Sequence, residues 1–175
     1  GKTWTEFASF PQIDASINPD NPTIRLGYPH QRFGFGDMAV AANNIDNIMW
    51  LSSWNRQPAY TLNRGATWNI VRLPGEVNSE YHSHFGNYLN RKVLVADRVL
   101  ASTFYYYNAG GTNIQGMWRT SDGGKSWSRV FQGEITNFSV FNATLGSVPG
   151  KAGHLFFTPG QLQGDPDIAF KRSVD

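Results

Sequence analysis

Short alternations of apolar and polar residues, separated by turns rich in Gly, Pro and Asn, recur along the whole chain. A period of two residues is typical of β-strands that bury one face. The predicted strands cover residues 37–42, 48–53, 59–61 and 68–73, then 92–97, 101–107, 117–121 and 127–132, then 141–148, 154–158 and 168–172. A lone strand is predicted at residues 3–10 and a turn at 43–47, and the helix content should be close to nil.

One turn between predicted strands carries a recognisable pattern. Residues 120–127 read as S/T-x-D-x-G-x-x-W, which is called an Asp box or BNR repeat. Asp122 can accept hydrogen bonds from backbone N–H groups of the turn. Gly124 can take a positive φ without a Cβ penalty, and Trp127 can anchor the hairpin in a core. We therefore expect a tight β-hairpin here.

The same frame recurs at residues 61–68, with Asn in place of the aspartate. The box glycines are 59 residues apart (124 − 65), and residues 1–4 and 173–175 match the two halves of a further box. A period of roughly 50 to 65 residues with four short strands per unit predicts β-propeller blades. The box residues are expected to be structural rather than catalytic: Thr61, Asn63, Gly65, Trp68, Thr120, Asp122, Gly124 and Trp127. Trp4, which ends a half-box, is expected to be a core anchor like Trp68 and Trp127.

The strand pattern predicts an all-β fold of about three four-stranded antiparallel meanders, which are part of a larger propeller or assemble into one. The expected units are a trailing outer strand at 1–10, blades at 37–73 and 92–132, and an incomplete blade at 137–175. A propeller needs about four blades to close. We therefore expect the terminal strands to pair with further blades or with another copy of the chain.

The predicted strand order places the long loops on the propeller face opposite the boxes. Aromatic side chains in these loops could stack on the flat apolar faces of sugar rings, so this face is predicted to bind a polysaccharide or oligosaccharide. The candidates for that contact are Tyr28, Phe33, Trp54, Tyr81, His82 and Tyr88. Tyr105 to Tyr107 alternate between the two faces of a strand, and packing is favoured for them.

Two glutamates in one of these loops, Glu76 and Glu80, are the acid–base candidates. An inverting pair requires roughly 6.5–9.5 Å between its carboxyl groups, a distance that a sequence does not fix. His82 and His84 could reach one metal ion from a strand, but surface histidines are favoured because no third ligand is assignable. No catalytic residue is therefore assigned, and neither a metal nor a cofactor is expected.

Composition narrows the function classes. Lys and Arg number 15 against 13 Asp and Glu. The net charge of +2 does not indicate the basic surface of a nucleic-acid-binding protein. The chain has no cysteine, which excludes disulfides and thiolate sites. No apolar run is long enough to span a membrane. The absence of a signal peptide and of an initiator Met predicts a processed chain or an excised segment.

Several segments occur in an order that resembles glycoside hydrolase family 74, the xyloglucan-active β-1,4-glucanases. The matching segments are Gly1–Trp4, Asp37–Ala41, Ile48–Trp50, Gly65–Trp68, Val95–Val99, Ser121–Trp127 and Val148–Gly153. The resemblance implies two seven-bladed propellers with a glycan cleft between them, and this chain is similar to blades from late in the second propeller. It also implies a secreted, extracellular protein.

The family is inverting and uses two aspartates, one from each propeller, but the segments that carry them have no match here. Asp37 aligns with the start of an inner strand rather than with a catalytic loop. One hypothesis is therefore a scaffold segment of a xyloglucanase-like enzyme, which supplies structure and glycan subsites and is inactive alone. The alternative is a non-catalytic Asp-box propeller that binds glycan or protein on its long-loop face.

Overall fold

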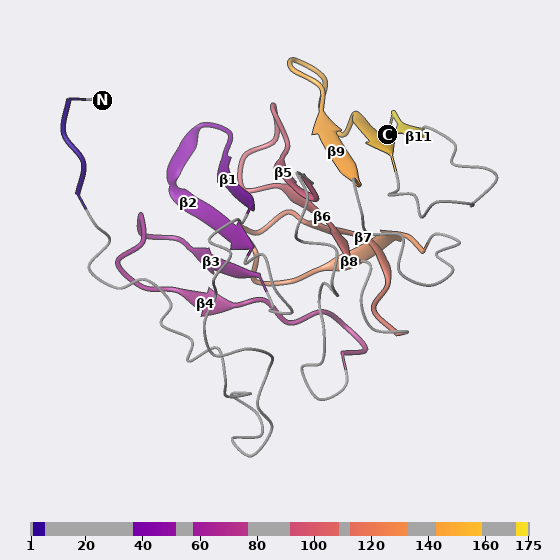
Figure 1. Ribbon diagram of the computed structural model, residues 1–175, viewed down its shortest axis with the longest axis horizontal. Coiled ribbons are helices and arrows are strands. Elements are labelled where there is room, and N and C mark those ends of the chain that lie inside the picture. Colours follow the sequence, from indigo (N-terminus) through magenta and orange to yellow (C-terminus); the bar gives the residue numbers. More distant parts are fainter. Residues whose placement is uncertain are drawn as a thin grey trace.

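Every regular element of the described chain is a β-strand (Figure 1). The computed structural model describes residues 2–5, 37–51, 58–76, 92–108, 113–132, 143–158 and 171–174. Within these ranges the strands form three antiparallel sheets, two of four strands and one of three. The predicted all-β fold of small meandering sheets is confirmed.

The first sheet contains β1 (Asp37–Ala41), β2 (Asn44–Leu51), β3 (Ala59–Thr61) and β4 (Asn69–Ile70). The second contains β5 (Leu94–Ala96), β6 (Phe104–Asn108), β7 (Gly116–Thr120) and β8 (Ser128–Phe131). The third contains β9 (Thr144–Ser147), β10 (Leu155–Thr158) and β11 (Lys171–Ser173). In each sheet, strands that follow one another in sequence are hydrogen-bonded neighbours, which is the meander that the sequence predicts.

The hairpin between β1 and β2 is tighter than predicted. A turn was expected at residues 43–47, but β2 begins at Asn44, which pairs with Ala41. Asn43 makes this possible because it adopts a positive φ of 57°. Asparagine tolerates this left-handed conformation better than most residues, so two residues suffice to reverse the chain.

The three sheets pack in series through their first strands, β1, β5 and β9, which are neighbours in Figure 1. Between the second and third sheets, the backbone of Lys92 accepts a hydrogen bond from Leu145 N at 2.7 Å and donates one to Ala143 O at 3.2 Å. Lys92, two residues before β5, and Thr144 of β9 thus form a parallel bridge between these two sheets. Because each sheet covers its neighbour, the hydrophobic core is continuous across all three.

Aromatic side chains of β6 fill the core on both faces of the second sheet. Tyr105, Tyr106 and Tyr107 are 3%, 0% and 1% exposed, so packing, the role favoured from the alternation, is confirmed for all three. Tyr107 contacts Phe157 of β10 with ring centroids 4.4 Å apart. Tyr106 meets Trp127 edge-on at 6.4 Å, a favourable arrangement for aromatic pairs.

The N-terminal segment differs from the prediction. Residues 2–5 are described and form no strand, whereas residues 6–10 of the predicted strand lie outside the described residues. The expectation that Trp4 anchors a core is wrong within this chain, because its side chain is 91% exposed. Residues 2–5 belong to none of the described sheets, so no strand pairing holds this segment against the core.

Candidate functional site

The turn at residues 120–127 is organised by the side chains of Thr120 and Asp122. The Thr120 hydroxyl donates to Asp122 Oδ1 at 2.7 Å and accepts a hydrogen bond from Gly124 N at 3.0 Å. Asp122 also accepts from Ser126 N at 3.0 Å and from Ser126 Oγ at 2.5 Å. The Trp127 indole N–H donates to Gly124 O at 3.0 Å. The turn thus binds its own backbone through short polar side chains.

These hydrogen bonds determine the ionisation of Asp122. Partial burial raises the pKa of the carboxyl group, but hydrogen bonds from Ser126, Thr120 and the backbone of Lys125 outweigh it and lower the pKa to about 2. Asp122 is therefore ionised at neutral pH, and both of its carboxylate oxygens accept hydrogen bonds from residues of the turn. Such a group is neither a general acid nor a free base.

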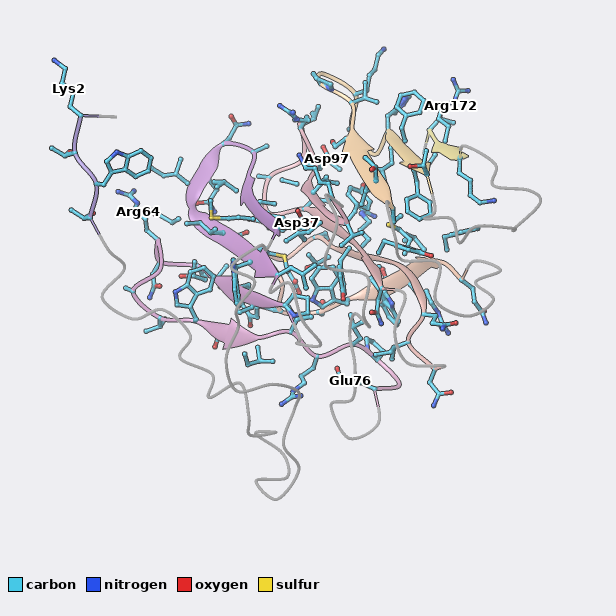
Figure 2. All side chains as sticks on the ribbon, in the orientation of Figure 1. Lys2, Asp37, Arg64, Glu76, Asp97 and Arg172 are labelled. Atoms are coloured by element: carbon cyan, nitrogen blue, oxygen red, sulfur yellow. The ribbon has the colours of Figure 1, made fainter. Side chains whose placement is uncertain are left out.

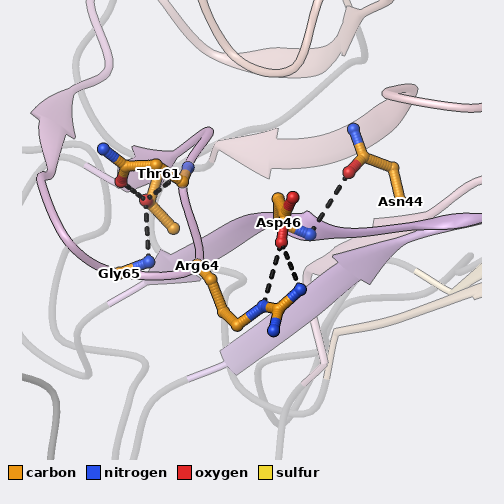
Figure 3. Close-up of polar contacts among 6 residues, drawn as sticks. Asn44, Asp46, Thr61, Arg64 and Gly65 are labelled. Carbon is orange, nitrogen blue, oxygen red and sulfur yellow. Dashed lines mark hydrogen bonds and ion pairs between the residues drawn. The ribbon is translucent and has the colours of Figure 1, made fainter.

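The turn at residues 61–68 repeats this geometry without the charge (Figure 3). The Thr61 hydroxyl donates to Asn63 Oδ1 and accepts from Gly65 N, both at 2.9 Å. Asn63 Oδ1 accepts from Thr67 N, and Asn63 Nδ2 donates to Thr67 Oγ1, again at 2.9 Å. Arg64 forms an ion pair with Asp46 at 2.8 Å. An amide therefore replaces the carboxylate without loss of the turn.

The turn of the second sheet packs directly on the first sheet. Asn47 Nδ2 on β2 donates to Gly123 O at 3.0 Å. A Cβ built on Gly124, whose φ is 113°, would lie 2.7 Å from Cγ of the Tyr60 ring, which is shorter than real contacts allow. Glycine is thus required at Gly124 by its backbone conformation and by the adjacent sheet. This turn is an inter-sheet contact.

Carboxylates also hold the sheets together. Asp37 Oδ2 accepts hydrogen bonds from Val93 N at 2.6 Å and Leu94 N at 3.2 Å, which joins the first sheet to the second. Figure 2 shows Asp37 and Asp97 in the middle of the molecule, away from Glu76. The prediction that Asp37 belongs to an inner-strand start rather than a catalytic loop agrees with this contact.

Asp97 is fully buried and joins the second sheet to the third. Its Oδ1 accepts from Val99 N and Leu100 N at 2.7 and 2.8 Å, and its Oδ2 accepts from Gly153 N at 2.9 Å. Burial opposes ionisation, but these hydrogen bonds and that of the Tyr105 hydroxyl lower the pKa of Asp97 below its usual range. The carboxylate therefore serves as a buried acceptor for backbone N–H groups.

Glu76, one of the two acid–base candidates, is described, whereas Glu80 lies outside the described residues. Glu76 Oε2 accepts from Leu73 N at 3.0 Å, and its Oε1 lies 3.6 Å from Arg72. Its side chain is only 5% exposed. In this structure the carboxylate closes the turn that follows β4.

The first strands of the three sheets border an open hollow of about 480 Å³. Its lining combines apolar and polar side chains, among them Met38, Val40, Lys92, Arg98 and Ser147. The acid in its wall is Asp97, whose oxygens already accept backbone hydrogen bonds. The lining of this hollow thus offers no pair of carboxylates for glycoside hydrolysis.

The residues predicted to contact sugar lie outside the described residues: Tyr28, Phe33, Trp54, Tyr81, His82 and Tyr88. In the described parts of the chain, no group of three or more His, Cys, Asp or Glu residues could hold a metal ion. The same parts include no helix that is long and apolar enough to cross a membrane.

Sequence reasoning did not identify the inter-sheet roles of Asn47 and Asp97. A signal for Asp97 exists, since an aspartate directly after a predicted strand often accepts hydrogen bonds from the next backbone N–H groups. The contacts with Gly123 and Gly153 have no such signal, because they join residues 76 and 56 positions apart.

No protein-family model and no curated protein sequence match the chain. Solved structures of similar fold include two GH74 enzymes. The GH74 enzyme of Niastella koreensis superposes with a TM-score of 0.57 at 21% identity, over 81% of this chain and 21% of that enzyme. The GH74 xyloglucanase of Xanthomonas campestris gives 0.50 at 18% identity, over 92% of this chain and 19% of that enzyme. This chain spans about a fifth of either enzyme and has the fold of a GH74 segment.

Proposed function

We propose that the chain is a propeller segment of a secreted, xyloglucanase-like glycoside hydrolase that acts on xyloglucan or a related β-1,4-glucan. It supplies the scaffold and part of the glycan-binding surface, and the catalytic residues come from elsewhere. The fold shared with a GH74 xyloglucanase supports the family and the polysaccharide partner. The two box turns and their repeated hydrogen bonds support assignment as Asp-box blades.

The main support for a scaffold role is that the described carboxylates already bind partners within the protein. The described residues include five, and each binds a partner within the protein: Asp37, Asp46, Glu76, Asp97 and Asp122. Glycoside hydrolysis requires one carboxyl group to protonate the leaving oxygen and another to activate water or attack the sugar. Four of the five accept hydrogen bonds from backbone N–H groups and are poorly suited to either task, and Asp46 forms an ion pair with Arg64.

The hydrolysis test is a reducing-sugar assay of the purified chain on xyloglucan. We expect no turnover by the isolated chain. Turnover that disappears in Glu76→Ala or Glu80→Ala would contradict the proposal and place the active site in the loop at 74–91. Binding without turnover on a glycan array would agree with the proposal, and binding to a protein alone would favour the non-catalytic alternative.

Sugar contact is tested at Trp54 in the long-loop face. An exposed aromatic platform contributes about 1–2 kcal/mol, so Trp54→Ala should weaken binding of xyloglucan oligosaccharides roughly 5- to 30-fold and leave the thermal midpoint unchanged. Trp4→Ala is the matched control, because Trp4 is 91% exposed and belongs to the N-terminal segment. Equal affinity of the Trp54 variant and the parent chain would remove Trp54 from the site.

A further inference from the structure

The open hollow beside the first strands presents charges of one sign to solvent. Lys92 and Arg98 line it, and both side chains are exposed. The acid in its wall, Asp97, is 0% exposed, and its carboxylate accepts hydrogen bonds from three backbone N–H groups. A ligand in the hollow would therefore meet the two cations and not the carboxylate. A concave surface lined by one sign of charge concentrates ions of the opposite sign.

The two cations differ in what lies beside them. They are six positions apart (98 − 92) on a largely extended chain, so roughly 20 Å of backbone separates them. Arg98 is in the hairpin turn that follows β5, as Asn43 is in the turn that follows β1, and Ser147 ends β9 just before the corresponding turn. These three turns lie along the upper edge of the molecule in Figure 1. Because Asn43 and Ser147 also line the hollow, its Arg98 end brings together polar side chains of all three sheets.

The three side chains at this end have donors to offer a ligand. The Ser147 hydroxyl accepts a hydrogen bond from Arg98 N at 3.1 Å, which holds Ser147 next to Arg98. Among the described residues, the hydroxyl donates to no partner, and neither the Asn43 amide nor the Arg98 guanidinium forms a hydrogen bond or ion pair. Hydroxyl, amide and guanidinium groups are all hydrogen-bond donors. One fixed positive charge and two neutral donors are thus available to the same ligand.

We propose that Arg98, Asn43 and Ser147 form a binding site for an oxyanion, which we call the Arg98 site. A guanidinium binds the paired oxygens of a carboxylate or a phosphate through parallel N–H groups, and an amide and a hydroxyl can donate to the oxygens that remain. The ligand class is therefore a small molecule that carries a carboxylate or a phosphate. Lys92, at the far end of the hollow, adds positive potential without contacting the bound group.

The Arg98 site is separate from the surface proposed to bind sugar. It lies at the edge of the sheets that carries the box turns, since Gly123 N donates to Ser102 O, in the turn that contains Arg98, at 2.9 Å. The segment with Trp54 begins after Leu51, at the opposite end of β2. The proposal therefore goes beyond the proposed function and does not rest on it.

Isothermal titration calorimetry of the purified chain tests the site, with inorganic phosphate and with glucuronate as probes at constant ionic strength. We expect saturable binding of at least one of these anions, and no binding of glucose, the neutral counterpart of glucuronate. The tighter of the two anions identifies phosphate or carboxylate as the preferred group. Failure of both anions to saturate the chain, or binding of glucose as tight as that of glucuronate, would overturn the proposal.

Substitution of the arginine tests where the anion binds. Arg98→Gln should weaken binding of the preferred anion about tenfold or more, because it removes the charge and the paired donors. Arg172→Gln is the matched control, since Arg172 is also exposed but does not line the hollow, and it should bind as the parent chain does. Equal affinity of Arg98→Gln and the parent chain, or equal weakening in the control, would overturn the proposal.

Two further variants separate binding from folding. Arg98→Lys keeps the charge and loses the paired donors, so its affinity should lie between those of the parent chain and Arg98→Gln. Asn43→Gly removes the amide and tolerates the positive φ of 57° at this position, so it should weaken binding by a smaller factor than Arg98→Gln and keep the thermal midpoint. Parent-like affinity in both variants would contradict the assigned donors.

Amide NMR spectra of the parent chain locate the bound anion directly. The resonances of Arg98 and Ser147 should shift on titration, and shifts confined to other parts of the chain would overturn the proposal. Arg98→Gln should bind xyloglucan as the parent chain does, and Trp54→Ala should bind the anion as the parent chain does. A failed Arg98 site and a failed assignment of function are therefore distinguishable.

Discussion

The two box turns have nearly the same internal structure and different surroundings. In both, a buried threonine hydroxyl accepts a hydrogen bond from the backbone N–H of the box glycine. The turn at 120–127 packs on the first sheet, and Trp127 is 6% exposed. In the turn at 61–68, Trp68 is only partly buried and the Arg64 side chain is 63% exposed.

The difference separates what the box sequence determines from what the neighbouring sheet determines. The hydrogen bonds made by the threonine hydroxyl of each turn join residues at most four positions apart, so they form wherever the motif occurs. The burial of Gly123 and Gly124 arises from contact with Asn47 and Tyr60 of another sheet. The motif therefore forms the hairpin, and the adjacent sheet turns that hairpin into an inter-sheet contact.

The largest expected effect comes from adding a methyl group at the inter-sheet contact. Gly124→Ala should lower the free energy of unfolding by about 2–4 kcal/mol, because it adds a collision with Tyr60 to the strain of a positive φ. Gly150→Ala is the control: Gly150 also has a positive φ, of 71°, but a Cβ there meets nothing within 4 Å. It should cost only about 1 kcal/mol. Equal losses in urea denaturation would mean that the contact with Tyr60 is unimportant.

A smaller effect, equal in the two turns, is expected from removing the threonine hydroxyl. Thr120→Val and Thr61→Val keep the side-chain shape but leave the N–H of the box glycine without its acceptor, at a cost of about 1–3 kcal/mol each. Because this network is local, we expect the two losses to agree within about 0.5 kcal/mol. A much larger loss for Thr120→Val would show that the neighbouring sheet also governs the local network.

The smallest effect is expected from exchanging the box carboxylate for the amide found in the other box. Asp122→Asn should cost less than about 1 kcal/mol at pH 7, since Asn63 forms the same hydrogen bonds and partial exposure screens the charge. The pKa of Asp122 is about 2 in the folded chain, below its ordinary value of 3.8. Its stabilisation is therefore complete above the ordinary value and is lost as the pH falls toward 2.

The same exchange should therefore change how the free energy of unfolding depends on pH. The difference in unfolding free energy between the parent chain and Asp122→Asn should shrink as the pH is lowered from 5 to 2, the range set by the two pKa values. Chemical denaturation at several pH values measures it. A constant difference would show that the Asp122 carboxylate has no special ionisation in the fold.

Local pattern was sufficient to predict much of the fold. Alternation located the strands of all three sheets, and the box motif located two turns whose hydrogen bonds are local. The start of β2 was missed because the positive φ of Asn43 shortens its turn. Trp4 was misjudged because burial depends on a neighbouring sheet and not on the motif.

Less of the candidate site could be predicted from the sequence, because its contacts also depend on how separate sheets pack together. Asp37 and Asp97 bind backbone N–H groups 56 or more positions away in the chain, and such pairs have no local signature. The aromatic residues proposed to bind sugar lie in loops outside the described residues, so their role stays a prediction.

The central claim is that the box turn of one sheet packs against the sheet before it, and a double-mutant cycle between Tyr60 and Gly124 tests it most directly. Tyr60→Gly removes both the ring and the Cβ of Tyr60 that a Cβ at Gly124 would strike. The double variant should therefore be less destabilised than the sum of the single variants by more than about 1 kcal/mol. Additive losses, within about 0.5 kcal/mol, would contradict the claim, because they would mean that the two residues do not meet.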